Sequence, residues 1–593
     1  MTTRFSLPNV PRRLILAAFL LLTLLSVGLV LDLANRGLVW QFAWSVTGEE
    51  EPVGQVRGLL EWAVTQTRPL PRTAPLTPVN YAHVNPYGIN TFWQLEVEEA
   101  KIERQAEMIA DAGFGWIRQQ FEWAEIEVDG RGQFTDSRND VDGDGAVDTI
   151  SGWLKYDRIV EIAEQHDLQI QARLDNPPRW TRADPDKGDF APPDDVQDFV
   201  NFAAAVAERY QGRIRFYQVW NEPNIYPEWG NQPVDPEAYT DLLCRTYDAL
   251  KAVDPDIVVI SGALAPTISL TGRDLNDFIF LQRMYDAGAG RCFDILSMQA
   301  YGLFSGPTDQ RMRPTTVNVA RNQYIRELMI ANGDAHKAIW FSEMAWNPVP
   351  SESDNPDVAD RYRFGQVTPA QAADYAPQLY QRAQEEWSWV GVINYWFFTR
   401  PTDFERNQSF YYFRMVEPDW SEEKPDYTPL PIYDSLRDFI TTQQPVLHEG
   451  AHVGEDHWAV RERELGPESA EADQFLLTAV QEYTFTTRGT DVRLRWQGRA
   501  LTLAVNGYYV DLEAAIPRGD GGESMEIRLE PSLLPETRDI RLVTDFPFTL
   551  EQITVVDRTY ERVFPLVAAA LTGLVTLVFV LVSAWRGRRG KAT

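Results

Sequence analysis

Short apolar, β-rich runs alternate with amphipathic helical patterns through the middle of this chain. The runs lie near Tyr87, Trp116, Gln169, Phe216, Ile257, Ile295, Ala338 and Gly391. Helical periodicity separates them over Val97–Ala112, Lys155–His166, Asp194–Tyr210, Pro236–Val253, Leu275–Ala287, Val317–Asn332 and Pro369–Glu386, and a last helical pattern covers Ile432–Thr441. This alternation predicts an α/β fold, namely a (β/α)8 TIM barrel over residues 81–442.

A different pattern follows over residues 445–560. Stretches such as Val492–Trp496 and Leu501–Val505 are rich in β-formers, and Asn506-Gly507 is a hairpin turn signal. The pattern predicts a β-sandwich accessory domain of the jelly-roll kind. Such a domain fits either carbohydrate binding or a spacer between the barrel and a membrane.

Both ends of the chain carry apolar segments that are long enough to cross a bilayer. Leu14–Leu31 contains no charged residue over 18 positions, and Val563–Trp585 contains none over 23. We therefore expect transmembrane helices over residues 14–33 and 563–585. Residues 34–80 then form a juxtamembrane segment, with one amphipathic helix over Val53–Thr67 and a proline-rich linker.

Basic residues flank the outer side of each apolar segment, at Arg4, Arg12 and Arg13 and at Arg586, Arg588, Arg589 and Lys591. The positive-inside rule then places the protein in the cell membrane, with both termini in the cytoplasm and everything between them outside. A cleaved signal peptide is the alternative for the first segment. We favour a retained helix, because no clear A-x-A cleavage site follows.

The composition narrows the range of partners. The 593 residues include 55 basic and 86 acidic side chains, so the formal net charge is −31, which argues against binding to nucleic acid or anionic lipid. The cysteines, Cys244 and Cys292, lie in barrel segments. Two buried free thiols are favoured over one disulfide, and the spacing fits no zinc site.

Two glutamates follow β-rich runs of the predicted barrel. Glu222 lies in Trp220-Asn221-Glu222-Pro223-Asn224, after Arg215–Val219, and Glu343 ends the run Ala338–Ser342. They are 343 − 222 = 121 positions apart, a spacing that fits strands 4 and 7 of a barrel. Two carboxyl groups at strand ends are what cleavage of a glycosidic bond requires. One protonates the leaving oxygen, and the other attacks or stabilises the sugar carbon.

On its motifs, the barrel resembles glycoside hydrolase clan A, in particular family 39 and related cellulase-like families. The resemblance covers about residues 81–440 and rests on an ordered set of strand-end motifs: Trp116–Arg118, Arg173–Trp180, Val219–Asn224, Ser297–Gly302, Phe341–Trp346 and Asn394–Trp396. It implies a retaining glycoside hydrolase that acts on a poly- or oligosaccharide and requires no cofactor.

The resemblance also implies roles for single residues. Glu222 matches the general acid/base, and Glu343 matches the nucleophile. Asn221 matches the amide that holds the sugar 2-hydroxyl, and Arg118 matches the arginine that keeps the nucleophile ionised. The other expected contacts are Tyr301, which matches a tyrosine that hydrogen-bonds the nucleophile, the aromatic platform Trp396, and the substrate-binding candidates Asn176, Trp180 and Trp346.

Gln299 departs from the clan pattern, in which a histidine often precedes this tyrosine by two residues. Contacts to the substrate can therefore differ from those of better-known members. The alternative for Glu222 and Glu343 is that they are salt-bridged loop acids, or relics in a non-catalytic surface protein that binds polysaccharide through the same cleft. Turnover of a model glycoside distinguishes these interpretations.

An acidic segment resembles the first half of a calcium-binding loop. Gly145 supplies the sharp turn, but Ser151 stands where a bidentate acid is needed. The sequence fits two interpretations of this segment: a loop that binds a structural calcium ion, or a solvated acidic insert without an ion. The candidate ligands are Asp140, Asp142, Asp144 and Asp148.

His448-Glu449-Gly450-Ala451-His452 formally fits the zinc-protease motif H-E-x-x-H, which requires a helix. Pro445, Gly450 and Gly454 argue against a helix. We therefore interpret the segment as the linker into the β domain.

Overall fold

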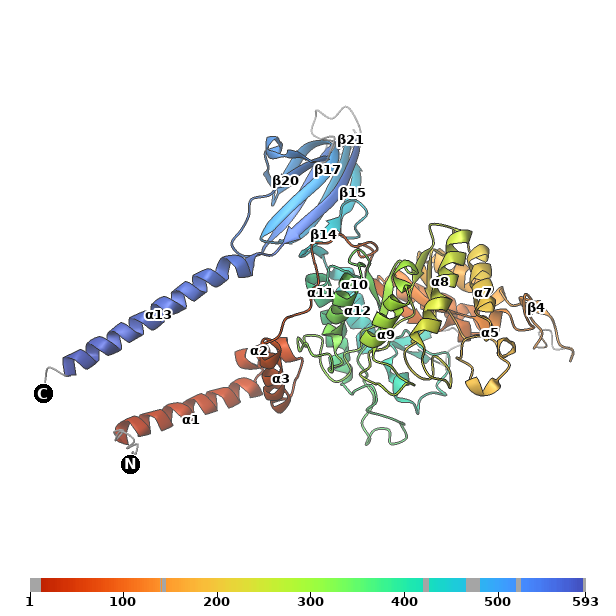
Figure 1. Cartoon of the computed structure of the whole chain (residues 1–593), viewed down its shortest axis with the longest axis horizontal. Helices are drawn as coiled ribbons and strands as arrows, with labels where there is room; N and C mark the ends of the chain where they lie inside the picture. The colour runs from red at the N-terminus through yellow and green to blue at the C-terminus, as the bar shows by residue number, and fades with distance from the viewer. Residues whose placement is uncertain are drawn as a thin grey trace.

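The structure is a computed structural model that describes residues 12–138, 140, 145–419, 426–465, 480–518 and 524–589. A barrel forms the body of the molecule, and a sheet-rich domain packs on one end of it (Figure 1). Two long helices, one from each end of the chain, project from this body.

Eight parallel strands form the barrel sheet, in the order β7-β6-β5-β2-β1-β10-β9-β8. The parallel bridges Ile260↔Ile295 and Leu264↔Met298 close the sheet between its two edges. This arrangement confirms the predicted TIM barrel. The strands are β1 (Tyr87–Thr91), β2 (Trp116–Glu122), β5 (Gln169–Asp175), β6 (Phe216–Val219), β7 (Val258–Ile260), β8 (Leu296–Gln299), β9 (Ile339–Met344) and β10 (Val390–Tyr395).

Helices cover the outside of the sheet close to their predicted positions. They are α4 (Glu99–Asp111), α6 (Leu154–Gln165), α7 (Val196–Arg209), α8 (Pro236–Val253), α9 (Asp277–Asp286), α10 (Asn322–Ala331), α11 (Pro369–Glu386) and α12 (Pro431–Thr442). Short elements extend the connecting loops: α5 (Trp123–Ile126), β3 (Thr135–Asp136), β4 (Ile150–Ser151), β11 (Val416–Asp419) and β12 (Asp426–Pro429).

Burial explains why the barrel strands are continuous apolar runs in the sequence. All residues of β1 and of β9 are buried, because helices cover one face of a parallel sheet and the barrel interior covers the other. Trp116, Phe216 and Trp340 meet inside the barrel near the amino ends of their strands, with ring centroids 4.9–5.3 Å apart. These rings fill that end of the barrel, so a cleft has room only at the carboxyl end.

The C-terminal domain is rich in β-structure and has its own apolar core around Leu494, Trp496 and Leu542. The long strand β21 pairs with β16 and with β17. A sheet-rich domain is thus confirmed, whereas its jelly-roll topology stays a prediction. The strands are β13 (Val446–Leu447), β14 (Gly450–Val453), β15 (Arg461–Leu465), β16 (Val480–Gly489), β17 (Asp491–Val505), β18 (Tyr508–Tyr509), β19 (Ile516–Arg518), β20 (Ser524–Arg528) and β21 (Glu536–Val556).

The ends of the chain form helices α1 (Arg12–Ala34), α2 (Leu38–Thr47), α3 (Pro52–Thr65) and α13 (Thr559–Arg589). Among the described residues, one helix alone is long and apolar enough to cross a membrane, α13 over Thr559–Leu581. Near the N-terminus, Phe19–Ala34 meets the same test only together with α2, from which it is bent by 60°. The pair of transmembrane helices therefore stays a prediction.

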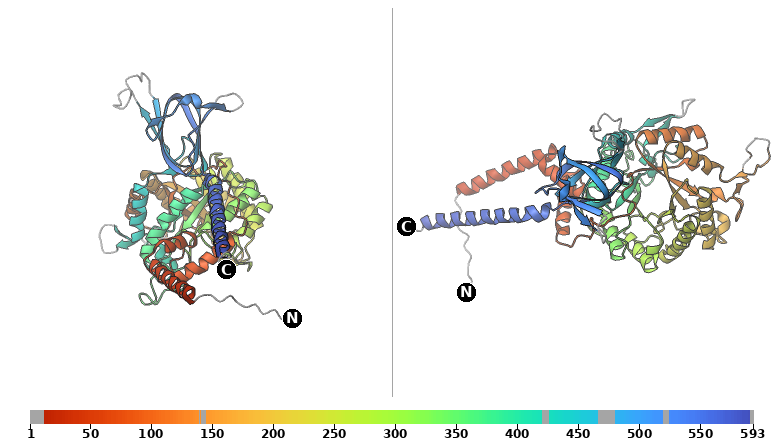
Figure 2. Two further views of the ribbon diagram at one scale, coloured as in Figure 1. Left: turned by 90° about the vertical axis from the view of Figure 1, so that its left-hand side faces the viewer. Right: turned by 90° about the horizontal axis from the view of Figure 1, so that it is seen from above.

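Helices α1 and α13 leave the body toward the same side, and their outer ends lie together (Figures 1 and 2). The view from above in Figure 2 shows the two helices running in roughly the same direction. The two candidate anchors can thus enter one bilayer without a change in the fold of the body.

The cysteines form a disulfide, so the expectation of two free thiols is wrong. Cys244 lies on α8, and Cys292 follows the short turn Ala289–Arg291 ahead of β8. Their Cα atoms are 4.7 Å apart, within the range that a disulfide spans. Spacing in the sequence did not show this, because it is the packing of α8 beside that turn that brings the two thiols together.

Candidate active site

The carboxyl ends of the barrel strands carry most of the predicted site residues. Arg118 lies within β2, Glu343 within β9, and Trp396 directly after β10. Glu222 follows β6 by three residues, and Tyr301 follows β8 by two. Because parallel strands end on the same side of a barrel, these side chains converge on one cleft.

Glu343 is 5% exposed and accepts hydrogen bonds on both of its oxygens. Arg118 donates from Nη1 to Oε1 at 3.0 Å, and the Tyr301 hydroxyl donates to Oε2 at 2.8 Å. Burial raises the pKa of Tyr301 well above its usual value, and the charge of Glu343 adds to this. Tyr301 therefore stays protonated and donates its hydroxyl proton to Glu343, which suits an ionised carboxylate as the acceptor.

Arg118 connects the strands beneath the cleft. Its guanidinium donates to Gln218 at 2.7 Å, and to Asn90 and Asn221 at 2.8 Å each, in addition to Glu343. Burial lowers the pKa of Arg118 to about 10, so the side chain is still a cation at neutral pH. These contacts fix the guanidinium, which then orients both Glu343 and the amide of Asn221.

Glu222 lies close to other negative charges, whereas Glu343 accepts hydrogen bonds from two donors. Burial raises the pKa of Glu222 well above its usual value, and the negative charges of Glu343 and Glu228 raise it further. The positive charge of Arg118 offsets this only in part. Glu222 is thus held in its protonated form, while Glu343 is paired with two donors.

An unusual backbone turn brings Glu222 into the cleft. Trp220 has a φ of +75°, in the left-handed region that a bulky side chain rarely adopts. Its Nε1 donates to the carbonyl of Glu228 at 2.8 Å, and its ring meets Trp229 at 5.4 Å. Packing therefore holds a strained residue at the strand end, as is common beside functional groups.

Glu228 is a cleft residue that the sequence did not single out. Burial raises the pKa of Glu228 to about 7, although the charge of Arg173 opposes the rise. Asn221 donates a hydrogen bond to its carboxyl group. Nothing in the sequence showed that Glu228 folds back beside Asn221.

The cleft encloses about 1160 Å³, with the solvent at its mouth included, so it has room for more than one sugar ring. Aromatic and polar side chains alternate around it, as expected for a surface that binds sugar rings on their flat faces and edges. Trp396 lines the cleft, with its ring 5.4 Å from that of Phe92. The other aromatic lining residues are Phe92, Phe190, Tyr301, Phe364, Phe410 and Phe413.

A second group of charged residues lies on the side of the cleft formed by β5. Arg173 pairs with Asp175 at 2.8 Å, and Asn176 donates to Glu122 at 3.1 Å. Burial raises the pKa of both acids. The predicted contact Asn176 thus lies at the cleft. Asp175 was not singled out although it lies in the motif Arg173–Trp180, and Glu122 was missed because no motif includes it.

Two predicted platforms lie away from the cleft. Trp346 is 1% exposed; its Nε1 donates to the Ser305 carbonyl at 2.8 Å, and its ring packs on Gly302. Trp180 is partly buried, and its Nε1 donates to the Glu127 carbonyl at 2.9 Å. Their polar edges are used within the fold, so they support loops of the cleft rather than its surface. Gln299, by contrast, lines the cleft.

The acidic segment is described only in part. Asp142 and Asp144 lie outside the described residues. Asp140 accepts a hydrogen bond from the Gly145 amide at 2.8 Å, and Gly145 has a φ of +88°, so the sharp turn of the motif is formed. Among the described residues, no group of three acidic, histidine or cysteine side chains is arranged to hold a metal ion.

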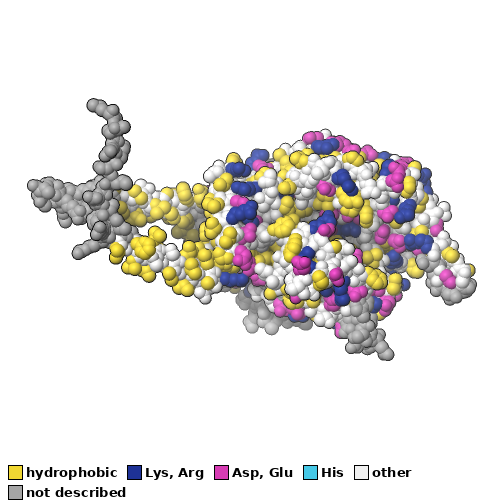
Figure 3. Space-filling model, turned by 90° about the horizontal axis from the view of Figure 1, so that it is seen from below, with side chains coloured by type: hydrophobic (Ala, Val, Ile, Leu, Met, Phe, Trp, Pro, Cys, Tyr) yellow, Lys and Arg dark blue, Asp and Glu magenta, His cyan; other side chains and the backbone are white. Residues whose placement is uncertain are grey.

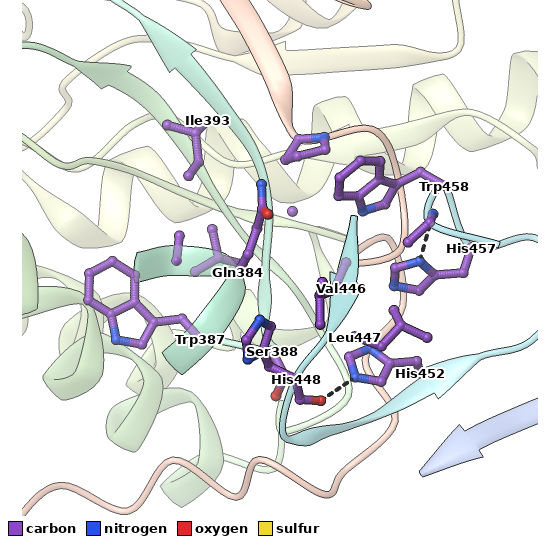
Figure 4. Close-up of a pocket in the computed structure, with 16 residues that line it drawn as sticks. Gln384, Trp387, Ser388, Ile393, Val446, Leu447, His448, His452, His457 and Trp458 are labelled. Carbon is purple, nitrogen blue, oxygen red and sulfur yellow. Dashed lines mark hydrogen bonds between the residues drawn. The ribbon is translucent and has the colours of Figure 1, made fainter. Parts of the chain in front are cut away.

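The H-E-x-x-H segment lies in a small hollow between the barrel and the sheet-rich domain (Figure 4). His448 follows β13, and His452 lies within β14, so the segment is not helical. The Nε2 atom of His452 donates to the His448 carbonyl at 2.8 Å. This geometry excludes the arrangement of a zinc protease and agrees with a linker.

Comparison with known proteins gives only distant similarities. No family model and no curated protein matches the chain. Among solved structures, a family 39 glycoside hydrolase from Bacteroides cellulosilyticus WH2 is 15% identical, with 79% of this chain and 82% of that chain covered and a TM-score of 0.44. A monomeric beta-xylosidase from Caulobacter crescentus CB15 is 14% identical, with 80% and 98% covered and a TM-score of 0.42.

A GH30 endoxylanase from Clostridium papyrosolvens C71 is 12% identical, with 80% of this chain and 99% of that chain covered and a TM-score of 0.37. At these low identities and TM-scores, the function has to be argued from the geometry of the cleft itself.

Proposed function

We propose that this chain is a membrane-anchored, extracytoplasmic retaining glycoside hydrolase that cleaves O-glycosidic bonds of a poly- or oligosaccharide by double displacement. The observation that carries the proposal is the contrast between two carboxyl groups in one cleft. Glu343 accepts from Arg118 and Tyr301, whereas Glu222 is partly buried and lies near the negative charges of Glu343 and Glu228. A carboxylate beside a protonated carboxylic acid is the pairing that glycoside hydrolysis uses.

In the first step, the Glu343 carboxylate attacks the anomeric carbon of the bound sugar. The bond to the leaving oxygen breaks, and that oxygen takes the proton of Glu222. A glycosyl ester on Glu343 results. The Arg118–Asn221 contact at 2.8 Å holds the Asn221 amide beside the reacting centre, where it can bind a sugar hydroxyl.

In the second step, Glu222 is ionised and removes a proton from water. The water attacks the anomeric carbon, the ester to Glu343 breaks, and the sugar leaves with its original configuration. Glu222 thereby regains the proton that it gave to the first leaving oxygen, and Glu343 is again a carboxylate, so the site is ready for another cycle. No metal or organic cofactor enters this scheme.

Two observations support an outward-facing, anchored enzyme. The Cys244–Cys292 disulfide is typical of oxidising compartments outside the cytoplasm. The projecting helices α1 and α13 lie on one side of the body with their outer ends together (Figure 2), and the basic clusters occur at those ends of the chain. Both features fit two cytoplasmic termini.

The second candidate function is a non-catalytic polysaccharide receptor that uses the same cleft. The aromatic lining around Trp396 favours sugar binding in either case. The raised pKa of Glu222 favours the enzyme, because a receptor gains nothing from a carboxyl group that is costly to ionise.

A panel of aryl glycosides and polysaccharides tests the proposal, with the product anomer followed by NMR. We expect retained configuration and loss of nearly all turnover in Glu343→Gln. Glu222→Ala should spare substrates with good leaving groups, and azide should accelerate its second step. Inverted product, or full activity in Glu343→Gln, would exclude the mechanism, and tight binding without any turnover would favour the receptor.

A further inference from the structure

We propose that the α2–α3 hairpin is an interfacial foot that lies in the headgroup region of the bilayer crossed by α1. The foot would hold one wall of the cleft at a fixed height above the membrane. This inference rests on the membrane anchoring in the proposed function. It replaces the expected linker at this point of the chain with a rigid support.

The hairpin has two apolar faces, and only one of them is packed. Trp40 and Ala43 on α2 and Gly58 on α3 are buried, and the ring of Trp44 on α2 contacts Tyr375 of the barrel, with centroids 5.3 Å apart. The other face carries large apolar side chains that are 45–84% exposed. They are Leu38, Val39 and Phe42 on α2 and Val53, Val56, Leu60 and Val64 on α3.

The exposed side chains form stripes rather than isolated positions. On α3 they recur at intervals of three and four residues, which places them on one side of the helix. On α2 they occupy positions i, i+1 and i+4. A contiguous apolar surface on two packed helices calls for a partner that covers it. Figure 3 shows apolar side chains along the projecting helices and on the adjoining part of the body.

The position of α2 relative to α1 identifies the partner as the bilayer. The 23 residues of α1 make a helix of roughly 35 Å, slightly longer than the hydrocarbon core of about 30 Å. A spanning α1 therefore ends at headgroup level at Ala34. Because α2 begins at Leu38, its stripe starts at that level, and the 60° bend directs α2 away from the α1 axis. An amphipathic helix at that depth lies in the interface.

The joint between α1 and α2 is fixed by specific contacts. Asp32 on α1 accepts hydrogen bonds from the amides of Val39 and Trp40 at 3.0 and 3.1 Å. A Cβ atom on Gly37 would lie 2.2 Å from the Asp32 carboxylate. Arg36 pairs with Glu50 at 2.6 Å across the hairpin. The foot therefore keeps its angle to the membrane helix.

The packed face joins the foot to the loop that follows Tyr301. The Gly306 amide donates to the Gly48 carbonyl at 2.8 Å, and the Gln310 amide donates to the Val46 carbonyl at 3.1 Å. Arg311 pairs with Glu49 at 2.9 Å. Since Tyr301 contacts Glu343, a short chain of contacts leads from membrane level to the candidate nucleophile.

Site-specific fluorescence quenching tests the foot in the full chain. The two native cysteines are joined in a disulfide, so a thiol-reactive bimane labels one introduced cysteine in each variant. The variants Phe42→Cys and Leu60→Cys report on the foot. Leu24→Cys, in the apolar part of α1, reports on the anchor, and Val97→Cys on the barrel is the matched control, since Val97 is apolar and 83% exposed.

Each labelled protein is reconstituted in phosphatidylcholine nanodiscs and quenched either by brominated phosphatidylcholine or by aqueous iodide. We expect labels at positions 24, 42 and 60 to lose most of their fluorescence to brominated lipid and little to iodide. The label at position 97 should show the reverse. A neutral lipid is used because the net charge of −31 disfavours an anionic surface.

The outcomes separate the foot from the anchor. If positions 42 and 60 respond like position 97 while position 24 is quenched by lipid, the foot is refuted and the anchor stands. If positions 42 and 60 are protected from both quenchers, protein covers the stripe, such as a second copy of this chain, and the proposal again fails. If position 24 is not quenched by lipid, the membrane anchoring itself is wrong.

Discussion

Glu228 lies six positions after Glu222, and both residues line the same cleft. The loop after Glu222 folds back toward the strand end, where Trp220 Nε1 donates to the Glu228 carbonyl. Burial raises its pKa to about 7, and its charge in turn raises the pKa of Glu222. In Glu228→Gln, the pKa of Glu222 should therefore fall. The alkaline limb of the kcat/KM profile should then move to lower pH, by roughly one unit for a nearby like charge.

The pH profile separates this role from a structural one. Loss of packing would lower kcat/KM at all pH values, whereas loss of the charge moves the limb. Glu208→Gln, an exposed position on α7, is the control and should leave the profile unchanged. If the alkaline limb of the kcat/KM profile stays at the same pH in Glu228→Gln, the coupling between the two carboxyl groups is contradicted.

The acid/base residue should also weaken the fold at high pH. The folded-state pKa of Glu222 lies well above its ordinary value of 4.5. The folded state therefore keeps a proton that the unfolded chain loses, and stability falls as pH rises from 4.5 through the raised pKa. Glu222→Gln cannot ionise, so it should raise the melting temperature at pH 8 by a few degrees, at roughly 1.4 kcal/mol for each unit of pKa shift.

Calorimetry at pH 8 and pH 4.5 checks this expectation. The stabilising effect of Glu222→Gln should be largest at pH 8 and small at pH 4.5, where the folded state is protonated and the unfolded chain is already half protonated. Equal melting temperatures of the variant and the parent at pH 8 would mean that Glu222 ionises without cost, and it would then be a poor general acid.

At the level of single residues, the sequence predicts strand ends well and loops poorly. Glu222 and Glu343 could be placed at one end of the barrel because each follows a β-rich run, whereas Arg118 and Tyr301 were expected only from the resemblance to clan A. The burial of Trp346 was not, since it depends on contacts with Gly302 and Ser305 from another loop. The pairing of the two cysteines likewise depends on tertiary packing.

The elements that join the barrel to the sheet-rich domain carry a cluster of histidines, of which His457 is buried and His452 partly buried. His452 and His457 lie with ring centroids 5.2 Å apart, and Nδ1 of His457 accepts a hydrogen bond from the Ala459 amide at 3.1 Å. Burial lowers the pKa of His457 well below 6.5, and the charges of His452 and His83 lower it further. The folded state therefore excludes a proton that the unfolded chain binds below pH 6.5.

Stability at this junction should consequently fall as pH drops through 6.5. His457→Gln keeps a polar side chain that does not titrate, so its melting temperature should fall less between pH 7.5 and pH 5 than that of the parent. Hydrogen exchange in peptides over residues 446–459 gives the local readout. His166→Gln, on the outside of the barrel, is the control, and an identical pH response of His457→Gln and the parent would contradict this prediction.

The acidic loop between β3 and β4 gives a second prediction for an element. If Asp140, Asp142, Asp144 and Asp148 bind calcium, millimolar calcium should raise the melting temperature, with about 2.7 kcal/mol of stabilisation at 100 times the dissociation constant. Asp142→Ala should remove the rise, and Asp248→Ala, on α8, should keep it. If calcium does not raise the melting temperature of the parent protein, the loop is a solvated acidic insert without a bound ion.

Among the elements, the alternation of eight strands and helices was readable because periods of two and 3.6 residues differ clearly. The helix α3 was expected, but α2 was not. Its apolar residues lie on two faces, one packed and one exposed, so its pattern merges with the apolar run of α1 in the sequence. A bend supported by Asp32 and Gly37 separates the two helices only in three dimensions.

For the whole molecule, the two projecting helices determine on which side of a membrane the cleft would lie. The basic residues beyond each apolar segment predict that both termini are cytoplasmic, and Figure 1 shows both helices leaving one side of the body. The barrel and the sheet-rich domain would then lie together outside the membrane. Under the proposed function, the enzyme would act on glycans within reach of the cell surface.

Reporter fusions in cells test this topology. A reporter joined after Thr593 should be active only if it functions in the cytoplasm, and a reporter joined after Asp557, at the end of the sheet-rich domain, should be active only if it functions outside. An N-terminal tag that stays on the mature protein identifies a retained first helix, whereas its loss identifies a cleaved signal peptide. A cytoplasmic signal from the Asp557 fusion would overturn the localisation, and the disulfide would then need another explanation, because the cytoplasm keeps thiols reduced.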